Sequence, residues 1–308
     1  RVLLLEAGGR DINPMIHIPL LCGVLYPSKM SNWFYNSEPD PNLNNREIFI
    51  PRGKTLGGSS SINGMVYIRG HARDYDIWRQ TGCEGWSYDD VLPYFRRSEE
   101  HLDRTDDFHG TDGAVRVGRG TMKNPLFDAF IAAGQAAGYP FTDDFNGAQQ
   151  EGFGRYDFTI AKGRRQSTAV AFLRPAKKRP NLDIVTHAHT TRVLFEGRRA
   201  VGVEYERMGE RIQVHAGREV VLSAGTINSP AILQLSGIGR GEDLVALGVP
   251  VVAKSKGVGQ NLQDHVAVYV QHLCTQPVTF LSMFRPQVAP FALLQAALFG
   301  TGVAAAFP

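Results

Sequence analysis

One segment, residues 51–76, constrains this chain more than any other. It reads PRGKTLGGSSSINGMVYIRGHARDYD and sets two adjacent glycines, Gly57 and Gly58, before three serines. Because Gly58 has no Cβ, its backbone can approach a flat or anionic ligand closely. The three serine hydroxyls offer short donors, and the amides of such a turn can surround an anion. A surface loop would explain GGSSS alone, but it would not explain YIRG and DYD beside it.

The chain begins with RVLLLEAGG. Residues 2–5 are a continuous apolar run, which is typical of a buried parallel strand. Glu6 follows at the end of this strand, and two glycines open the next turn. In a dinucleotide-binding fold an acidic residue at this place binds a ribose, about 20 residues after a G-x-G-x-x-G loop. No residue precedes Arg1 to hold that loop, so we expect the first βα unit to lie outside this sequence.

A second segment, residues 220–239, reads VVLSAGTINSPAILQLSGIG. The pattern predicts a buried strand, a turn at Ala224 and Gly225, and a helix capped by Ser229 with Pro230 in its first position. A glycine turn that leads into a helix N-terminus can receive a phosphate or a ribose. An ordinary βα junction has the same pattern, so only the exact order of residues can distinguish a cofactor-binding turn from such a junction.

The two segments resemble the two signatures of the glucose–methanol–choline (GMC) oxidoreductases, which are FAD-dependent alcohol oxidases and dehydrogenases. GVGQNLQDH, residues 257–265, resembles the turn that follows in this family. The resemblance covers essentially the whole chain and is strongest to the branch that includes choline dehydrogenases and acceptor-linked alcohol dehydrogenases. It implies an α/β fold: a Rossmann-like FAD-binding domain interleaved with an α+β substrate domain, both incomplete. We expect the former at 1–120 and 180–265, and the latter at 121–179 and 266–308.

The resemblance also implies which residues hold FAD. Glu6 matches the acid that binds the adenosine ribose, and Thr190 lies where the family often has a valine whose backbone meets the adenine. Residues 63–66 match the segment that packs along the flavin and pyrophosphate. The expected FAD-binding residues are Glu6, Thr55, Gly57, Gly58, Ser59, Asn63, Gly64, Met65, Val66, Thr190, Ala224 and Gly225. Ile62 stands where some members carry the histidine that attaches FAD covalently, so we expect non-covalent FAD.

The implied reaction is oxidation of an alcohol to an aldehyde or ketone, with a hydride passing to flavin N5. The family's catalytic base is a histidine near the C-terminus, since imidazole titrates close to neutral pH. The histidines here precede that region, so we expect no catalytic residue in this sequence, and we interpret His265 and His109 as structural. His187 and His189 alternate as on one strand face, but two ligands without a third do not make a metal site.

Two alternatives stay open. Some members of the family are lyases or photo-decarboxylases, and fold alone does not decide the reaction. The chain could also be a catalytically silent fragment that binds FAD or a nucleotide. The expected partners are a small-molecule alcohol and an electron acceptor, which is a quinone, another carrier or oxygen. Choline would need an aromatic cage or a carboxylate for its ammonium group, whereas an aliphatic alcohol would need an apolar pocket.

Composition bears on the partners of the protein and on its cellular compartment. The 308 residues carry a formal charge of +3 and suffice for two domains. The basic clusters at 162–165 and 174–180 lack interleaved aromatics, so we interpret them as solvated faces and expect no nucleic-acid partner. Three separated cysteines favour a reducing compartment. We expect a cytoplasmic protein, with peripheral association at the inner membrane as an option. The apolar residues 290–308 are interrupted, which favours a core or interface helix over a membrane span.

Other elements follow from periodicity and capping. We predict helices at 91–101, 125–138 and 166–173, the last capped by Ser167 or Thr168. Strands are predicted at 153–160, 182–186, 193–196, 200–205, 214–215 and 219–223, with a hairpin turn at 197–199. Residues 13–45 have no sustained period and are interpreted as a long excursion that covers a functional site.

Overall fold

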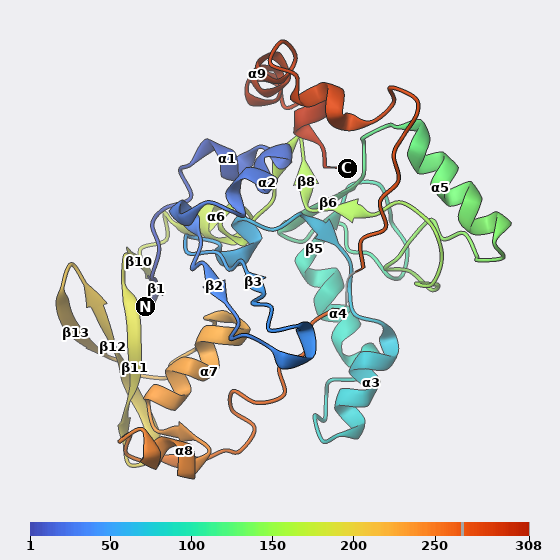
Figure 1. The fold of residues 1–308 in the computed structure, drawn as a ribbon. Coiled ribbons are helices and arrows are strands. Elements are labelled where there is room, and N and C mark those ends of the chain that lie inside the picture. Colours follow the sequence, from blue (N-terminus) through green and yellow to red (C-terminus); the bar gives the residue numbers. More distant parts are fainter. Residues whose placement is uncertain (266–267, 308) are drawn as a thin grey trace. The chain divides into compact units, whose positions relative to one another are not determined.

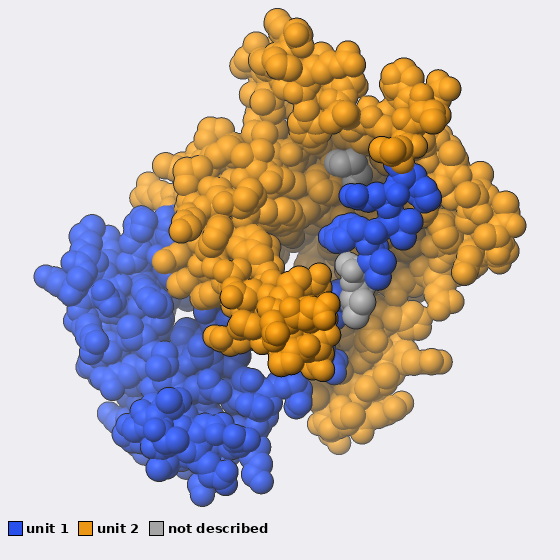
Figure 2. All heavy atoms as spheres, in the orientation of Figure 1, with its two compact units in different colours: residues 1–9, 180–272 blue, residues 10–179, 273–308 orange. Residues whose placement is uncertain are grey.

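In the computed structural model, residues 1–265 and 268–307 are described (Figure 1). The chain divides into two compact units, coloured separately in Figure 2. Unit 1 spans residues 1–9 and 180–272, and unit 2 spans residues 10–179 and 273–308. The expected division into an FAD-binding and a substrate domain stays a prediction. Residues 266, 267 and 308 of the expected substrate domain lie outside the described residues.

Unit 1 combines short sheets with the helices α7 and α8. Its elements are β1 (Val2–Glu6), β10 (Leu182–Thr186), β11 (His189–Glu196), β12 (Arg199–Arg207), β13 (Glu210–His215), α7 (Gly225–Leu235), β14 (Ile238–Gly239), α8 (Gly241–Ala246) and β15 (Ala253–Lys254).

The N-terminal strand β1 pairs in parallel with β10, with Val2 opposite Leu182 and Glu6 opposite Thr186. The expected strand and its parallel pairing are therefore confirmed. The expected burial is wrong, because Val2 is 57% and Leu3 41% exposed. Within the described residues β10 is the one strand that pairs with β1.

Strands β11, β12 and β13 form an antiparallel sheet in that order. The turn from β11 to β12 passes through Gly197 at φ +58°, as expected for a hairpin. These strands confirm the predictions at 193–196, 200–205 and 214–215. The strand predicted at 219–223 is wrong: these residues are in no strand, and Val221 is 73% exposed. Its apolar sequence has no pairing strand among the described residues.

Unit 2 is larger than unit 1, and the elements that make it up include many single turns. They are α1 (Pro14–His17), η1 (Pro19–Leu21), α2 (Cys22–Leu25), η2 (Lys29–Ser31), β2 (Tyr35–Asn36), η3 (Pro41–Leu43), β3 (Phe49–Ile50), η4 (Gly58–Ser61), β4 (Val66–Tyr67), α3 (Ala72–Gln80), α4 (Tyr88–Ser98), β5 (Glu99–His101), β6 (Val115–Arg119), α5 (Pro125–Ala136), β7 (Asp157–Phe158), β8 (Ile160–Ala161), β9 (Arg164–Arg165), the π-helical turn η5 (Ala169–Leu173), α6 (Arg174–Ala176), η6 (Phe280–Phe284), α9 (Ala289–Phe299) and η7 (Val303–Ala305).

A four-stranded sheet with the order β4-β7-β6-β5 lies in unit 2. The helix predicted at 91–101 begins earlier, since Ser87 and Asp90 form a capping box before α4. It also ends earlier, because Glu99 leaves the helix and pairs with Val115 in β6. Of the strand predicted at 153–160, only the short β7 and the start of β8 form.

Two other helix predictions have clear local causes. Helix α5 confirms the prediction at 125–138: the side chain of Asn124 accepts from Leu126 N, and Pro125 takes the first position. The helix predicted at 166–173 appears as η5 followed by α6. Of the two expected caps, Ser167 accepts a hydrogen bond from Val170 N at 3.3 Å.

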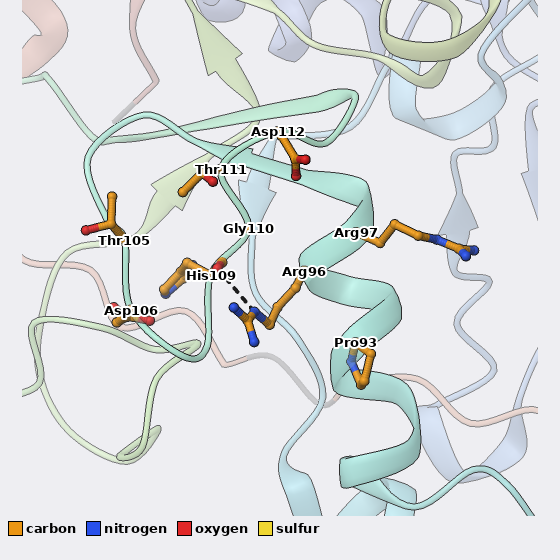
Figure 3. Close-up of a pocket in the computed structure, with 9 residues that line it drawn as sticks. All are labelled: Pro93, Arg96, Arg97, Thr105, Asp106, His109, Gly110, Thr111 and Asp112. Carbon is orange, nitrogen blue, oxygen red and sulfur yellow. Dashed lines mark hydrogen bonds between the residues drawn. The ribbon is translucent and has the colours of Figure 1, made fainter.

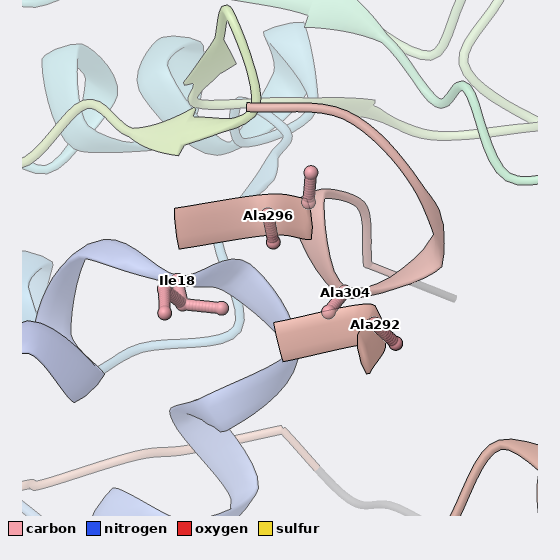
Figure 4. Packing of buried hydrophobic residues seen from close by; sticks show 5 residues of the cluster. Ile18, Ala292, Ala296 and Ala304 are labelled. Carbon is pink, nitrogen blue, oxygen red and sulfur yellow. The ribbon is translucent and has the colours of Figure 1, made fainter. Parts of the chain in front are cut away.

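One side of the C-terminal apolar segment packs against the rest of unit 2. Ala292 and Ala296 of α9 contact Ile18 and Ala304, and all four are buried (Figure 4). These small side chains let the backbone segments approach closely. A core or interface helix was expected here, and a helix forms, but its burial is limited to the alanine side: Phe291, Leu298 and Phe299 are 74%, 65% and 74% exposed. No helix within the described ranges is long and apolar enough to cross a bilayer.

Candidate functional site

The first signature folds into a tight turn in unit 2. Gly57 has φ +90° and Gly58 φ +54°, in the left-handed region that glycine tolerates best. A Cβ on Gly57 would lie 2.4 Å from Ser61 Oγ, whereas a Cβ on Gly58 would have no neighbour within 4 Å. Packing therefore requires glycine at 57, and Gly58 leaves one side of the turn open. The carbonyl of buried Thr55 accepts from Gly58 N at 2.8 Å and closes the turn.

The serines of the signature serve mainly the turn itself. The hydroxyl of Ser60 donates to the Gly57 carbonyl at 2.6 Å and accepts from Thr168 N at 2.9 Å. Ser61 is fully buried and donates to a carbonyl of the same turn at 2.8 Å. The hydroxyl of Ser59 accepts from a backbone amide at 3.2 Å. The expectation that all three hydroxyls offer donors to a ligand is therefore wrong for Ser60 and Ser61, because carbonyls already accept their hydrogens.

Arg165 holds the second half of this turn. Its side chain is 1% exposed, and its Nη1 donates to the Asn63 carbonyl at 2.7 Å, to Asn63 Oδ1 at 2.7 Å and to the Ser60 carbonyl at 3.1 Å. Its Nε donates to the carbonyl of Ile16 at 2.7 Å. Burial lowers the pKa of Arg165 to about 10. The interpretation of residues 162–165 as a solvated face is therefore wrong for Arg165.

Residues 63–66 continue from the turn into β4. Asn63 Oδ1 also accepts from Met65 N at 3.1 Å. Met65 has φ +62° and is 1% exposed, and its carbonyl accepts from Thr159 N at 2.9 Å. Asn63 and Val66 are exposed on either side of it, and Gly64 is half-buried. The expected FAD-binding residues of unit 2 thus lie along one continuous, well-anchored segment.

In unit 1, Glu6 lies beside the start of β11. Its Oε1 accepts from Gly8 N at 2.7 Å, so the carboxylate closes the turn after β1. Its backbone carbonyl accepts from Ala188 N at 2.9 Å. Thr190 follows two residues later and is half-buried in β11. The structure therefore brings the backbone of Glu6 close to the segment that carries Thr190.

His187 and His189 do not share a strand face. His187 has φ +56° and lies in the bend between β10 and β11, while His189 is the first residue of β11. The predicted alternation is wrong because the chain turns at His187, where its amide donates to the Gly8 carbonyl at 2.9 Å.

The second signature begins helix α7. Ala224 is the N-cap, and Gly225 is the first helical residue, with φ +85° and open space where a Cβ would lie. The predicted helix start at Pro230 is wrong, since Pro230 lies inside α7. The hydroxyl of Ser229 accepts from Ala224 N at 3.0 Å. Ser229 therefore supports the helix entrance from within, and does not precede it.

A buried charge network lies elsewhere in unit 2. Arg69, from the YIRG part of the first signature, donates to Glu99 at 2.8 Å. His109 meets Glu99 at 3.1 Å through Nδ1 and Asp144 at 2.9 Å through Nε2. Burial opposes the charged ring, but the bonds to Asp144 and Glu99 outweigh it and raise the pKa of His109 to about 9. Burial likewise opposes the Asp144 carboxylate, yet its bonds to His109 and a backbone amide lower its pKa to about 2.

An open hollow lies next to this network, and its lining residues are Pro93, Arg96, Arg97, Thr105, Asp106, His109, Gly110, Thr111 and Asp112 (Figure 3). Arg96 reaches toward His109 and donates to its carbonyl at 3.4 Å. Ligand atoms of Glu99, His101 and His109 lie within 4.8 Å of one another. The guanidinium of Arg69 already pairs with Glu99, so a metal ion there would have to displace it. We interpret the group as an ion-pair network.

The profile of the GMC oxidoreductases matches residues 14–267. The chain belongs to the GMC oxidoreductase family. It is 52% identical over 283 residues to the oxygen-dependent choline dehydrogenase of Sinorhizobium fredii, covering 91% of this chain and 51% of that protein. It is 50% identical over 298 residues to the mitochondrial choline dehydrogenase of Mus musculus, covering 93% and 49%. An FAD-dependent oxidoreductase from Chaetomium thermophilum has a similar structure, with a TM-score of 0.87 at 28% identity, covering 99% and 55%.

These comparisons confirm the expected family and its α/β FAD-binding fold class. The chain spans about half the length of the curated relatives it matches. GMC oxidoreductases are FAD flavoproteins, and the turn of the first signature fits such a group in two respects. Gly58 leaves one side of the turn open, and Nη2 of Arg165 is buried with no partner among the described residues. Sequence reasoning missed Arg165, because the local GRR pattern carries no signal of burial.

Proposed function

We propose that the protein oxidises an alcohol to an aldehyde or ketone with FAD, and that choline is the alcohol to test first. One observation gives the main support for this proposal. In a chain about 50% identical to two choline dehydrogenases, the GMC signature folds into a turn that is locked on one side and open at Gly58. FAD, when bound, supplies the acceptor for the hydride that leaves the alcohol carbon.

The residues proposed to bind FAD fall into two groups. In unit 2 the open side of the turn and the exposed Asn63 and Val66 would lie along the flavin and pyrophosphate; this group is Thr55, Gly57, Gly58, Ser59, Asn63, Gly64, Met65 and Val66. In unit 1 the Glu6 carboxylate would accept from the ribose hydroxyls; this group is Glu6, Thr190, Ala224 and Gly225. The open space at Gly225 supports close approach of the cofactor there as well.

We propose that FAD is held without a covalent bond. Ile62, which takes the place of the family's attachment histidine, is 2% exposed and packs against Ile16 and Leu25. Its side chain has no nucleophilic atom, and its burial in an apolar cluster leaves the flavin to be held by packing and hydrogen bonds.

The electron acceptor and the setting are further parts of the proposal. The name of the Sinorhizobium fredii relative makes oxygen the acceptor to test first, with a quinone or another carrier as alternatives. We place the reaction in the cytoplasm, where oxygen or a soluble carrier could accept the electrons, or at the surface of the inner membrane, where a quinone could do so.

The test uses the full-length protein. It should be purified with the visible absorbance band of oxidised flavin, and anaerobic choline should bleach that band. Gly58→Ala should lose most of the bound FAD, because the new methyl fills the open side of the turn. Gly197→Ala is the matched control: Gly197 has φ +58° against +54° for Gly58 and also has open space around a Cβ, but it lies in a hairpin.

The outcomes separate the alternatives. A colourless wild-type protein would overturn the proposal, because it would show that no flavin is bound. Bound flavin that is bleached by aliphatic alcohols but not by choline would overturn the choice of substrate. Bound flavin that no alcohol reduces would favour the catalytically silent FAD-binding alternative, or a lyase or photo-decarboxylase. Equal loss of FAD in both glycine variants would overturn the assignment of Gly58.

A further inference from the structure

Among the residues that the structure describes, Arg165 is a buried cation without an anionic partner. None of the ion pairs formed by the residues that the structure describes includes it. The titratable groups that act on it are Cys22 and Tyr26, and burial raises the pKa of both, so both are neutral at pH 7. A buried charge without a counter-charge costs several kcal/mol.

The hydrogen bonds of Arg165 all go to uncharged acceptors, and most of them hold the signature turn. Three of them fix the carbonyls of Ser60 and Asn63 and the side chain of Asn63, and a fourth fixes the carbonyl of Ile16. A neutral donor could make such bonds at a lower desolvation cost. The charge itself, together with the unpartnered Nη2, therefore points to an acceptor that is not part of the described residues.

The segment that Arg165 holds is the one on which the flavin is proposed to lie. Two-electron reduction of a flavin, with uptake of one proton, leaves one additional negative charge on the ring system. The alcohol supplies both electrons and the hydrogen as a hydride, and its hydroxyl proton goes to the base. A fixed cation in a water-excluded site stabilises such a charge more than it would in water.

We propose that Arg165 is a positioning residue for the flavin, which locks the Ser60–Asn63 turn and, through its uncompensated positive charge, favours the reduced cofactor. This inference rests on the proposed function, since it needs bound FAD. Arg165 is not a catalytic residue here, because its side chain contacts the turn and not the reacting atoms.

The test compares three variants of the full-length holoenzyme. Arg165→Gln removes the charge, Arg165→Lys keeps the charge but loses the guanidinium fork, and Arg164→Gln is the control. Arg164 is the neighbouring arginine, and it donates to the carbonyl of Ala297 in α9, away from the signature turn. The readouts are the dissociation constant of FAD and the reduction potential of the bound flavin, neither of which requires turnover.

For Arg165→Gln we expect FAD affinity to fall at least tenfold. We also expect the equilibrium for flavin reduction to become at least tenfold less favourable, which is about 30 mV for a two-electron couple. Arg165→Lys should lose affinity by at least tenfold but keep a potential close to that of the wild type. Arg164→Gln should match the wild type in both readouts.

Four results would overturn the inference. One is a wild-type potential in Arg165→Gln, which would make Arg165 purely structural. Another is a potential in Arg165→Lys that falls by the tenfold equilibrium shift despite the retained charge, and a third is unchanged FAD affinity in that variant. If Arg165→Gln does not fold, the potential and FAD affinity of Arg165→Lys still test the inference. The fourth is an equal effect in Arg164→Gln. Absence of flavin from the wild type would instead overturn the proposed function.

Discussion

The buried network around His109 makes the stability of the protein depend on pH in a defined direction. His109 is 1% exposed, and both of its ring nitrogens meet carboxylates, at 3.1 Å on Glu99 and 2.9 Å on Asp144. The pKa of His109 in the folded chain is raised from 6.5 to about 9. A raised pKa means that the folded state binds the proton more tightly than the unfolded state does.

The contribution of His109 to the free energy of unfolding follows from its pKa values in the unfolded and folded states. The interval between 6.5 and about 9 corresponds to roughly 3 kcal/mol, at about 1.4 kcal/mol for each pKa unit. This contribution is fully present below pH 6.5 and is lost as the pH rises through about 9. Asp144 acts in the opposite range: its pKa is lowered from 3.8 to about 2, so its contribution is present above pH 3.8 and is lost as the pH falls through about 2.

The assay is urea unfolding of the full-length protein at a series of pH values between 6.5 and 9. The wild type should lose stability with a slope of about 1.4 kcal/mol per pH unit over this window. His109→Gln should be less stable at pH 6.5 and should lack that slope, since the amide does not titrate. The control is His215→Gln, at an exposed position at the end of β13. An equal slope in the wild type and in His109→Gln would refute the reasoning.

Three further predictions follow from the signature segment. Gly57→Ala should lower the free energy of unfolding by about 1–3 kcal/mol, because its φ is +90° and the new Cβ would lie 2.4 Å from Ser61 Oγ; an unchanged urea midpoint would contradict this. Asn146→Ala should cost about 1–3 kcal/mol, since the Asn146 amide bonds two backbone groups of the YIRG segment at 2.7 and 3.0 Å; a loss of under half a kcal/mol in the same assay would count against it. With Ile62 at the attachment position, acid precipitation should release all flavin into the supernatant, and flavin that stays in the pellet would show a covalent bond.

Local signals in the sequence were sufficient for several elements. Helix α5 could be predicted because Asn124 caps it and Pro125 takes its first position, which are both short-range effects. Strand β1 could be predicted from its apolar run. Its burial could not, because burial depends on which strands pair with it and not on its own residues.

The parts that could not be predicted depend on contacts between distant residues. Arg165 sits in a basic cluster that reads as a surface, yet it is buried by partners 102 and 149 residues away. Helix α7 begins at Gly225 and not at Pro230 because the Ser229 side chain bonds back to Ala224 N, an option that the sequence does not distinguish from capping. His109 could be interpreted as structural from its turn, but its two carboxylate partners come from other segments.

The bonds that complete the signature turn also set an order of events during synthesis. Asn63 and Arg165 are 102 residues apart, so at about 5–20 residues per second the arginine is made roughly 5–20 s after the asparagine. Until then the carbonyls of Ser60 and Asn63 lack their distant donor, and closing so long a loop carries an entropic cost. The first signature of the family is therefore made early, but its turn gains its distant hydrogen bonds only after Arg165 has left the ribosome.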